Sequence, residues 1–251
     1  MQNPAIPLGQ PELLAPRLPE IPVQPRQLDR IKGLYHRCKE SDSNFASVMF
    51  RFARLKAQGK NIFAHERTVI RGANNITTRG NVRIGIDNFG FTHPHDVSLL
   101  NVRGRLNFNG AGYCVGRGCR FDIGENAVMN VGAGHVSPGT IFVIEHGLDI
   151  GEHTVISWNC QFLDEDYHSI DYDGRVPKSP EIRIGDHVWI GCNCTILKGV
   201  SIPNGCVVAA NSVVTKQFDE ENALIAGNPA RIIKRDVRWG SRSLGEQLVL
   251  D

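Results

Sequence analysis

The sequence lacks the segments that mark membrane-spanning and secreted proteins. No apolar run among its 251 residues approaches the roughly 20 that a helix needs to cross a bilayer. Its first residues carry neither a basic start nor an apolar stretch of signal-peptide length. The seven cysteines are an odd number without a C-x-x-C pair, which argues against a disulfide framework. These absences predict a cytoplasmic protein.

A large excess of charge of either sign is also absent. The net charge is +2, so there is no bulk electrostatic case for nucleic acid as a partner. The length is sufficient to bury a sizeable core in one large or two smaller domains. Composition therefore indicates a globular protein and leaves its activity to be found in the sequence pattern.

A six-residue repeat dominates residues 184–215. Every sixth position is a branched aliphatic residue, and the position four residues later is small or β-branched. The first set is Ile184, Ile190, Ile196, Ile202, Val208 and Val214, and the second is Val188, Cys194, Val200, Cys206 and Ser212. A helix has a period near 3.6 and a strand a period of 2. A period of six instead predicts a short strand followed by a corner, repeated as a parallel β-helix.

The repeat extends less regularly to about residue 61. Strand-like pieces, separated by glycines and asparagines that tolerate tight corners, recur at 82–86, 106–110, 120–124, 128–132 and 140–144. With three hexapeptides to a triangular coil, the β-helix domain at 61–216 is expected to hold roughly eight coils. The repeat breaks at 163–183, where acidic and proline residues predict a loop outside the coil. Residues 217–251 form a short C-terminal extension.

Residues 1–60 differ from the repeat domain. The first 26 contain seven prolines, which predict an extended or disordered lead. Residues 27–58 place apolar side chains at helical spacing and predict two short amphipathic helices, with Asp42-Ser43 as the N-cap of the second. These helices are expected to cover the open end of the coil. Because the second helix is basic, peripheral membrane contact through 44–60 stays open.

Several stretches resemble the hexapeptide-repeat acetyltransferases, and most of all the branch that O-acetylates sugars and polysaccharide units, with galactoside and maltose acetyltransferases as relatives. The resemblance rests on the [Ile/Val]-Gly repeats, the loop ending in His168-Ser-Ile, and the runs HVWIGCNCTILKGVSI, VVAANSVVTK and AGNPARIIK. It is strong over about 144–235, generic over 61–143 and absent over 1–60. It implies a left-handed coil, a homotrimer with sites between subunits, and acetyl-CoA as co-substrate in the groove between neighbouring coils.

One departure from the family pattern lies at a corner. The family commonly has Gly-Ala-Gly-Ser where this chain has Ala209-Ala210-Asn211-Ser212. Asn is the usual substitute for Gly in the left-handed conformation, so we expect Asn211 to preserve the corner.

Acetyl transfer from a thioester to a hydroxyl needs a base, an oxyanion donor and orientation of both substrates. His168 is the expected base, because it lies where the repeat breaks and matches the family's base by resemblance. Asp164, Glu165 and Asp166 precede it and are candidates to orient its ring. Asp166 is the first choice and Glu165 the second, although a backbone carbonyl could do the same and an acidic solvated loop is the plainer interpretation.

The remaining site residues are assigned by resemblance. Trp189 flanks the acetyl and acceptor site, and its backbone amide is a candidate oxyanion donor. The pantetheine arm is lined by Cys192, Ala210 and Thr215, and the phosphates are contacted by Lys216 and Lys234, with Arg231 and Arg235 as alternatives. Cys160, Cys194 and Cys206 fall on the inward position and are expected to be inert, so transfer is expected to be direct, without an acyl-enzyme.

The favoured interpretation is thus an acetyl-CoA-dependent O-acetyltransferase for a sugar, oligosaccharide or surface-polysaccharide precursor, without a metal. An N-acetyltransferase for a nucleotide-linked amino sugar is the main alternative, since fold does not decide function. Acceptor contacts could come from Asn159, Glu145, His146 and Tyr167. A carbonic-anhydrase-like zinc enzyme would use His146, His153, His168 and His187. A non-catalytic β-helix scaffold is the last alternative.

Overall fold

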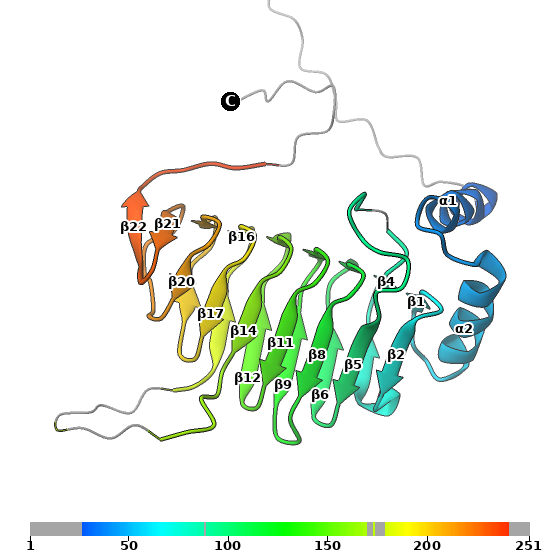
Figure 1. Ribbon diagram of the computed structural model, residues 1–251, viewed down its shortest axis with the longest axis horizontal. Coiled ribbons are helices and arrows are strands. Elements are labelled where there is room, and N and C mark those ends of the chain that lie inside the picture. The colour runs from blue at the N-terminus through cyan, green and yellow to red at the C-terminus, as the bar shows by residue number, and fades with distance from the viewer. Residues whose placement is uncertain (1–26, 88, 170–172, 174–178, 241–251) are drawn as a thin grey trace, which may run out of the picture.

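The computed structural model describes residues 27–87, 89–169, 173 and 179–240, so the predictions for the N-terminal lead and the last eleven residues lie outside the described residues. Short parallel strands wind through these ranges into three sheets, A, B and C, which form the sides of a β-helix (Figure 1). The mainly β fold with hexapeptide repeats is therefore confirmed. None of the described helices is long and apolar enough to cross a membrane.

The strands visit sheets A, B and C in turn. Sheet A contains β1 (Ile62–Ala64), β4 (Asn81–Ile84), β7 (Gly112–Val115), β10 (Gly134–Val136), β13 (Thr154–Ile156), β16 (Trp189–Ile190), β19 (Val207–Val208), β21 (Leu224–Gly227) and β22 (Ala230–Lys234). Sheet B contains β2 (Thr68–Arg71), β5 (Ser98–Val102), β8 (Arg120–Ile123), β11 (Ile141–Ile144), β14 (Gln161–Leu163), β17 (Thr195–Leu197) and β20 (Val213–Val214). Sheet C contains β3 (Ile76–Thr78), β6 (Arg105–Phe108), β9 (Val128–Val131), β12 (Gly147–Ile150), β15 (Ile182–Ile184) and β18 (Ser201–Ile202). We name each corner by the sheets that it joins: A–B, B–C and C–A.

The number of coils is smaller than the sequence predicted. Sheet B has seven strands, one for each coil, rather than roughly eight. Two excursions account for the difference, because residues between β4 and β5 and between β14 and β15 lie outside the regular coil. The second excursion leaves the register intact, since Ile150 of β12 pairs directly with Ile184 of β15.

The inward side chains of the coil form one continuous core. All eleven predicted repeat positions, the set from Ile184 to Val214 and its plus-four partners, are buried. Phe121, Phe142 and Phe162 occupy the same register in neighbouring strands of sheet B, and their rings stack at centroid distances of 4.6 and 4.7 Å. Each coil therefore adds its side chains to a column that the next coil continues.

Asparagines form a ladder along the A–B corner. Asn159, Asn193 and Asn211 have φ values of 57°, 56° and 60°, in the left-handed region. The amide of Asn211 donates to the carbonyl of Cys192 in the coil before it, at 2.9 Å. The corner predicted to survive at Asn211 is thus confirmed.

Two helices cover the N-terminal end of the coil (Figure 1). They are α1 (Gln27–Glu40) and α2 (Phe45–Ala57). Leu55 of α2 joins the core of the β-helix, and Val48 is fully buried. The N-cap of α2 is Asn44, whose side chain accepts from the amide of Ser47 at 2.9 Å, so the prediction of Asp42-Ser43 was wrong by one or two residues.

The C-terminal end closes differently. β21 joins sheet A in parallel with β19, and β22 returns antiparallel to β21. This hairpin occupies the strand edge at which an eighth coil would continue. Trp239 then folds back onto the C–A corner, where its ring stacks on His187 at a centroid distance of 4.2 Å.

Candidate functional site

The excursion after β14 is fixed to the B–C corner by a buried carboxylate. Asp164 has no exposed surface, and its side chain accepts the backbone N–H groups of Glu145, His146 and Gly147 at 2.7, 2.8 and 2.8 Å. An acidic loop exposed to solvent was the plainer interpretation of this residue, and for Asp164 that interpretation is wrong. A buried carboxylate needs such donors, and the turn between β11 and β12 supplies them.

Glu165 holds a second contact across the same corner. Its Oε2 lies 2.7 Å from Nε2 of His146, and its Oε1 accepts the amides of Asp166 and Tyr167 at 2.7 and 3.1 Å. The hydrogen bond with His146, and after it the hydrogen bonds with the two amides, lower the pKa of the Glu165 carboxyl from 4.5 to about 2. The Glu165 carboxylate therefore contacts His146 and the amides of its own loop rather than His168.

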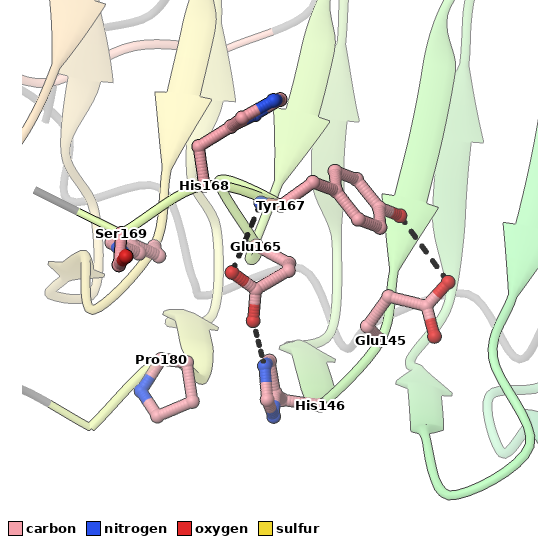
Figure 2. Close-up of a pocket in the computed structure, with 8 residues that line it drawn as sticks. Glu145, His146, Glu165, Tyr167, His168, Ser169 and Pro180 are labelled. Carbon is pink, nitrogen blue, oxygen red and sulfur yellow. Dashed lines mark hydrogen bonds and ion pairs between the residues drawn. The ribbon is translucent and has the colours of Figure 1, made fainter.

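His168 lies exposed at the mouth of the loop. Its Nδ1 is 3.3 Å from the backbone carbonyl oxygen of Asp166. The Asp166 carboxylate instead pairs with Nζ of Lys198 at 2.6 Å. Figure 2 shows the imidazole directed away from the pair of Glu165 and His146. Of the three carboxylates and the backbone carbonyl predicted as candidates to orient the ring, only the carbonyl contacts it among the described residues.

A cavity of about 710 Å³ opens beside this loop. It is lined by Glu145, His146, Glu165, Tyr167, His168, Ser169, Pro180 and Lys198. The hydroxyl of Tyr167 donates to Oε1 of Glu145 at 3.2 Å, as Figure 2 shows. Three of the four predicted acceptor contacts therefore lie together here. The fourth, Asn159, lies on the A–B corner instead.

Trp189 lies on sheet A, away from this cavity. Its side chain is 40% exposed, and its indole N–H donates to Oγ of Ser157 at 3.2 Å. Its backbone amide donates to the carbonyl of Cys206 at 3.0 Å, within the sheet ladder. That amide is already satisfied, so the structure does not support it as an oxyanion donor.

The predicted pantetheine residues fall on two corners. Cys192 and Ala210 lie in successive coils on the A–B corner, and Cys192 is only half-buried. Thr215 follows β20 at the B–C corner and is exposed. One chain therefore does not gather them into one groove.

The predicted phosphate contacts are exposed cations near the C-terminal end. Lys216 has its Nζ 5.1 Å from the centroid of the Phe218 ring, and Lys234 ends β22. Of the alternatives, Arg235 pairs with both carboxylate oxygens of Glu220 at 2.5 and 3.1 Å, and Arg231 donates to the Ala230 carbonyl at 2.9 Å. Within the described residues, the two lysines therefore have fewer polar contacts than Arg235.

The three inward cysteines are buried as their spacing predicted. Cys160, Cys194 and Cys206 have no exposed surface. Burial raises the pKa of the Cys206 thiol, which disfavours the reactive thiolate. A covalent role for these residues has no geometric basis.

The four histidines considered for zinc do not converge. His146 is at the B–C corner, whereas His153 and His187 are at the C–A corner. Within the described ranges, no group of three or more His, Cys, Asp or Glu side chains is placed to hold a metal ion.

One aromatic group, Trp239 with His187 and Trp189, was not predicted from the sequence. Trp239 donates its indole N–H to the carbonyl of His187 at 3.0 Å, and Nε2 of His187 lies 3.1 Å from the Trp239 carbonyl. The Trp239 ring lies 6.1 Å from that of Trp189. Only a tertiary contact brings residue 239 to this corner, so no local pattern could have shown it.

Comparison with known proteins places these features in context. Residues 181–216 match the model of the hexapeptide repeat of succinyl-transferase. A protein of Klebsiella pneumoniae described as an uncharacterized 24.8 kDa protein in the cps region is 34% identical over 215 residues, which span 84% of this chain and 96% of that protein. The putative lipopolysaccharide biosynthesis O-acetyl transferase WbbJ of Escherichia coli (strain K12) is 33% identical over 144 residues, or 53% of this chain and 72% of WbbJ. The polySia-specific acetyltransferase NeuO has a TM-score of 0.45 at 20% identity, over 74% of this chain and 80% of that one.

Proposed function

This chain belongs to the hexapeptide-repeat acetyltransferases, and on that premise we propose that it transfers an acetyl group from acetyl-CoA to a hydroxyl of a saccharide, with His168 as general base. The observation that carries the proposal is the position of His168, exposed at a 710 Å³ cavity with its Nδ1 beside a fixed carbonyl. The similarity to a lipopolysaccharide O-acetyl transferase supports a saccharide as acceptor.

The proposed reaction needs the tautomer with the proton on Nδ1, which the Asp166 carbonyl beside that atom favours. If Nδ1–H donates to the Asp166 carbonyl, the lone pair of Nε2 is free to accept the proton of an acceptor hydroxyl. The hydroxyl oxygen then forms a bond to the thioester carbonyl carbon. Collapse of the tetrahedral intermediate breaks the carbon–sulfur bond, and the departing thiolate takes the proton from Nε2. The products are the acetyl ester and CoA, and the histidine returns to its starting state.

The active unit that we propose is a homotrimer with sites between subunits. The cavity with His168 opens from the B–C corner, whereas Trp189 lies on sheet A and Cys192 on the A–B corner of the same chain. A neighbouring subunit would place its Trp189 and its pantetheine-binding corner against this cavity, with Lys216 and Lys234 near the CoA phosphates. Acetyl-CoA is a metabolite of the cell interior, so we place the activity in the cytoplasm.

The test measures release of CoA thiol with a panel of sugars, oligosaccharides and UDP-amino sugars. We expect a sugar or oligosaccharide hydroxyl to be the best acceptor, and His168→Ala to lower kcat by about 10²–10⁴-fold. His36→Ala, an exposed histidine of α1, is the matched control and should retain full activity.

Two results would contradict the proposal. Full activity of His168→Ala with the best acceptor would remove the histidine from the chemistry. Acetylation of a UDP-amino sugar at nitrogen, with no transfer to any hydroxyl, would make the enzyme an N-acetyltransferase.

A further inference from the structure

The N-terminal end of the molecule concentrates positive charge. Residues 27–80 hold eleven Lys or Arg and four Asp or Glu, a net charge of +7, although the whole chain carries only +2. The rest of the chain is therefore net negative. Eight of these basic residues are exposed: Lys32, Arg37, Lys39, Arg54, Lys56, Arg67, Arg71 and Arg79. Within the described ranges, the structure shows an ion pair for only one of these eight residues, Arg37, whose partner is Asp87.

A second face of α2 is apolar and exposed. Ala46, Phe50, Ala53 and Ala57 recur at helical spacing, and all are exposed. Phe50 is 72% exposed, a large value for an aromatic side chain. The inward face is separate, because Val48 and Leu55 on it are buried. Capping the coil therefore explains one face of α2 and leaves the other without a function.

Basic and apolar side chains meet beside a groove between α2 and β2. The groove has a volume of about 570 Å³, and its lining includes Phe50, Arg54 and Val69, the last of which is 39% exposed. Arg51 also lines it but is fixed, since its Nη2 donates to the Thr68 carbonyl at 2.5 Å. We call Phe50, Arg54 and Val69 the cap patch. Lys56 lies outside the groove lining on the same helix, where its Nζ donates to Oδ1 of Asn61 at 2.5 Å.

We propose that the cap patch binds the surface of a membrane that contains anionic lipids. An apolar helix face flanked by cations is the arrangement that inserts at the boundary of headgroups and acyl chains. A soluble polyanion would use the cations and leave Phe50 exposed to water. A second copy of the chain would bring two positive patches together, which their charge opposes. The inference stands apart from the acetyl transfer proposed above, since no cap-patch residue lines the cavity at His168.

The test is sedimentation of the full-length protein with vesicles. We expect binding to vesicles of equal parts phosphatidylcholine and phosphatidylglycerol, little binding to phosphatidylcholine alone, and a decrease as salt is raised. Arg54→Glu with Lys56→Glu should weaken partitioning by at least about 25-fold, since each basic residue contributes about fivefold. Phe50→Ser should also weaken it, whereas Arg105→Glu, an exposed charge reversal on β6, should not.

Three outcomes would overturn the inference. The first is equal binding to both kinds of vesicle, or none to either. The second is retention on polygalacturonate that Phe50→Ser leaves unchanged, which would identify an acidic polysaccharide as the partner. The third is a smaller oligomer of Phe50→Ser in light scattering, which would make the patch an interface between copies. Unchanged circular dichroism and thermal melting of each variant would show that lost binding is not lost folding.

Discussion

Three consecutive carboxylates before His168 have three different roles. Asp164 is buried and holds the turn before β12, Glu165 pairs with His146, and Asp166 pairs with Lys198. A sequence shows these residues as one acidic run, because charge and spacing alone do not reveal burial. Their separate partners decide what each substitution should do.

Asp166→Asn should leave most of the activity intact. The His168 ring has its contact with the Asp166 backbone carbonyl, which this substitution preserves. We expect kcat to fall by less than about tenfold, against the loss of about 10²–10⁴-fold for His168→Ala. The pH profile of kcat/KM should keep its shape. A loss as large as that of His168→Ala, with a shifted profile, would instead show that the carboxylate orients the ring.

Asp164→Ala should destabilise the protein by about 3 kcal/mol, because three backbone N–H groups lose their charged acceptor in a buried site. Urea unfolding followed by circular dichroism measures the change. Glu125→Ala is the matched control, since Glu125 is exposed on the B–C corner two coils before Asp164. A control that loses as much stability as Asp164→Ala would show that the corner itself, and not the buried carboxylate, is sensitive.

At the scale of elements, the stacked phenylalanines of sheet B tie successive coils together. Phe142 is fully buried between Phe121 and Phe162. Phe142→Ala should therefore lower the free energy of unfolding by about 3–5 kcal/mol, through lost burial and the cavity that remains. Phe50→Ala, a truncation of an exposed phenylalanine, should change it by less than about 0.5 kcal/mol. Thermal melts that shift equally for both variants would contradict this.

The elements themselves were largely predictable from the sequence. A period of six specifies a strand and a corner by local sterics, so the inward positions from Ile184 to Val214 could be predicted without any tertiary information. The five strand-like pieces upstream also coincide with β4, β6, β8, β9 and β11 within two residues. The contacts of Asp164 and Trp239 could not be predicted, because both join residues that the repeat does not place together.

At the scale of the whole molecule, the separation of the predicted site residues is the informative feature. His168 lines the cavity and Trp189 of sheet A does not, and in the homotrimer that we propose each site takes His168 from one subunit and Trp189 from its neighbour. Mixing His168→Ala with Trp189→Ala subunits should therefore restore activity that neither variant has alone. After equal mixing and exchange we expect about a quarter of wild-type activity, since each site needs one intact residue from each neighbour.

The measurement is thiol release after refolding the two variants together, with each variant refolded alone as the control. Activity of the mixture no higher than that of the separate variants, despite mixed trimers in native mass spectrometry, would place both residues in one subunit's site.

The pairing of β12 with β15 across the excursion has a consequence for how such enzymes diverge. Because the register of sheet C is set by Leu148, Ile150 and their partners Ile182 and Ile184, the length of the intervening segment does not enter it. Beyond Asp164, whose buried contacts fix the start of the segment, we expect insertions and deletions to cost little folding free energy while they reshape one wall of the cavity. Selection for a new acceptor can therefore act on the part of this segment that follows His168, and a chimera that keeps Asp164 and His168 but carries a relative's residues between His168 and Ile182 should inherit the relative's acceptor preference.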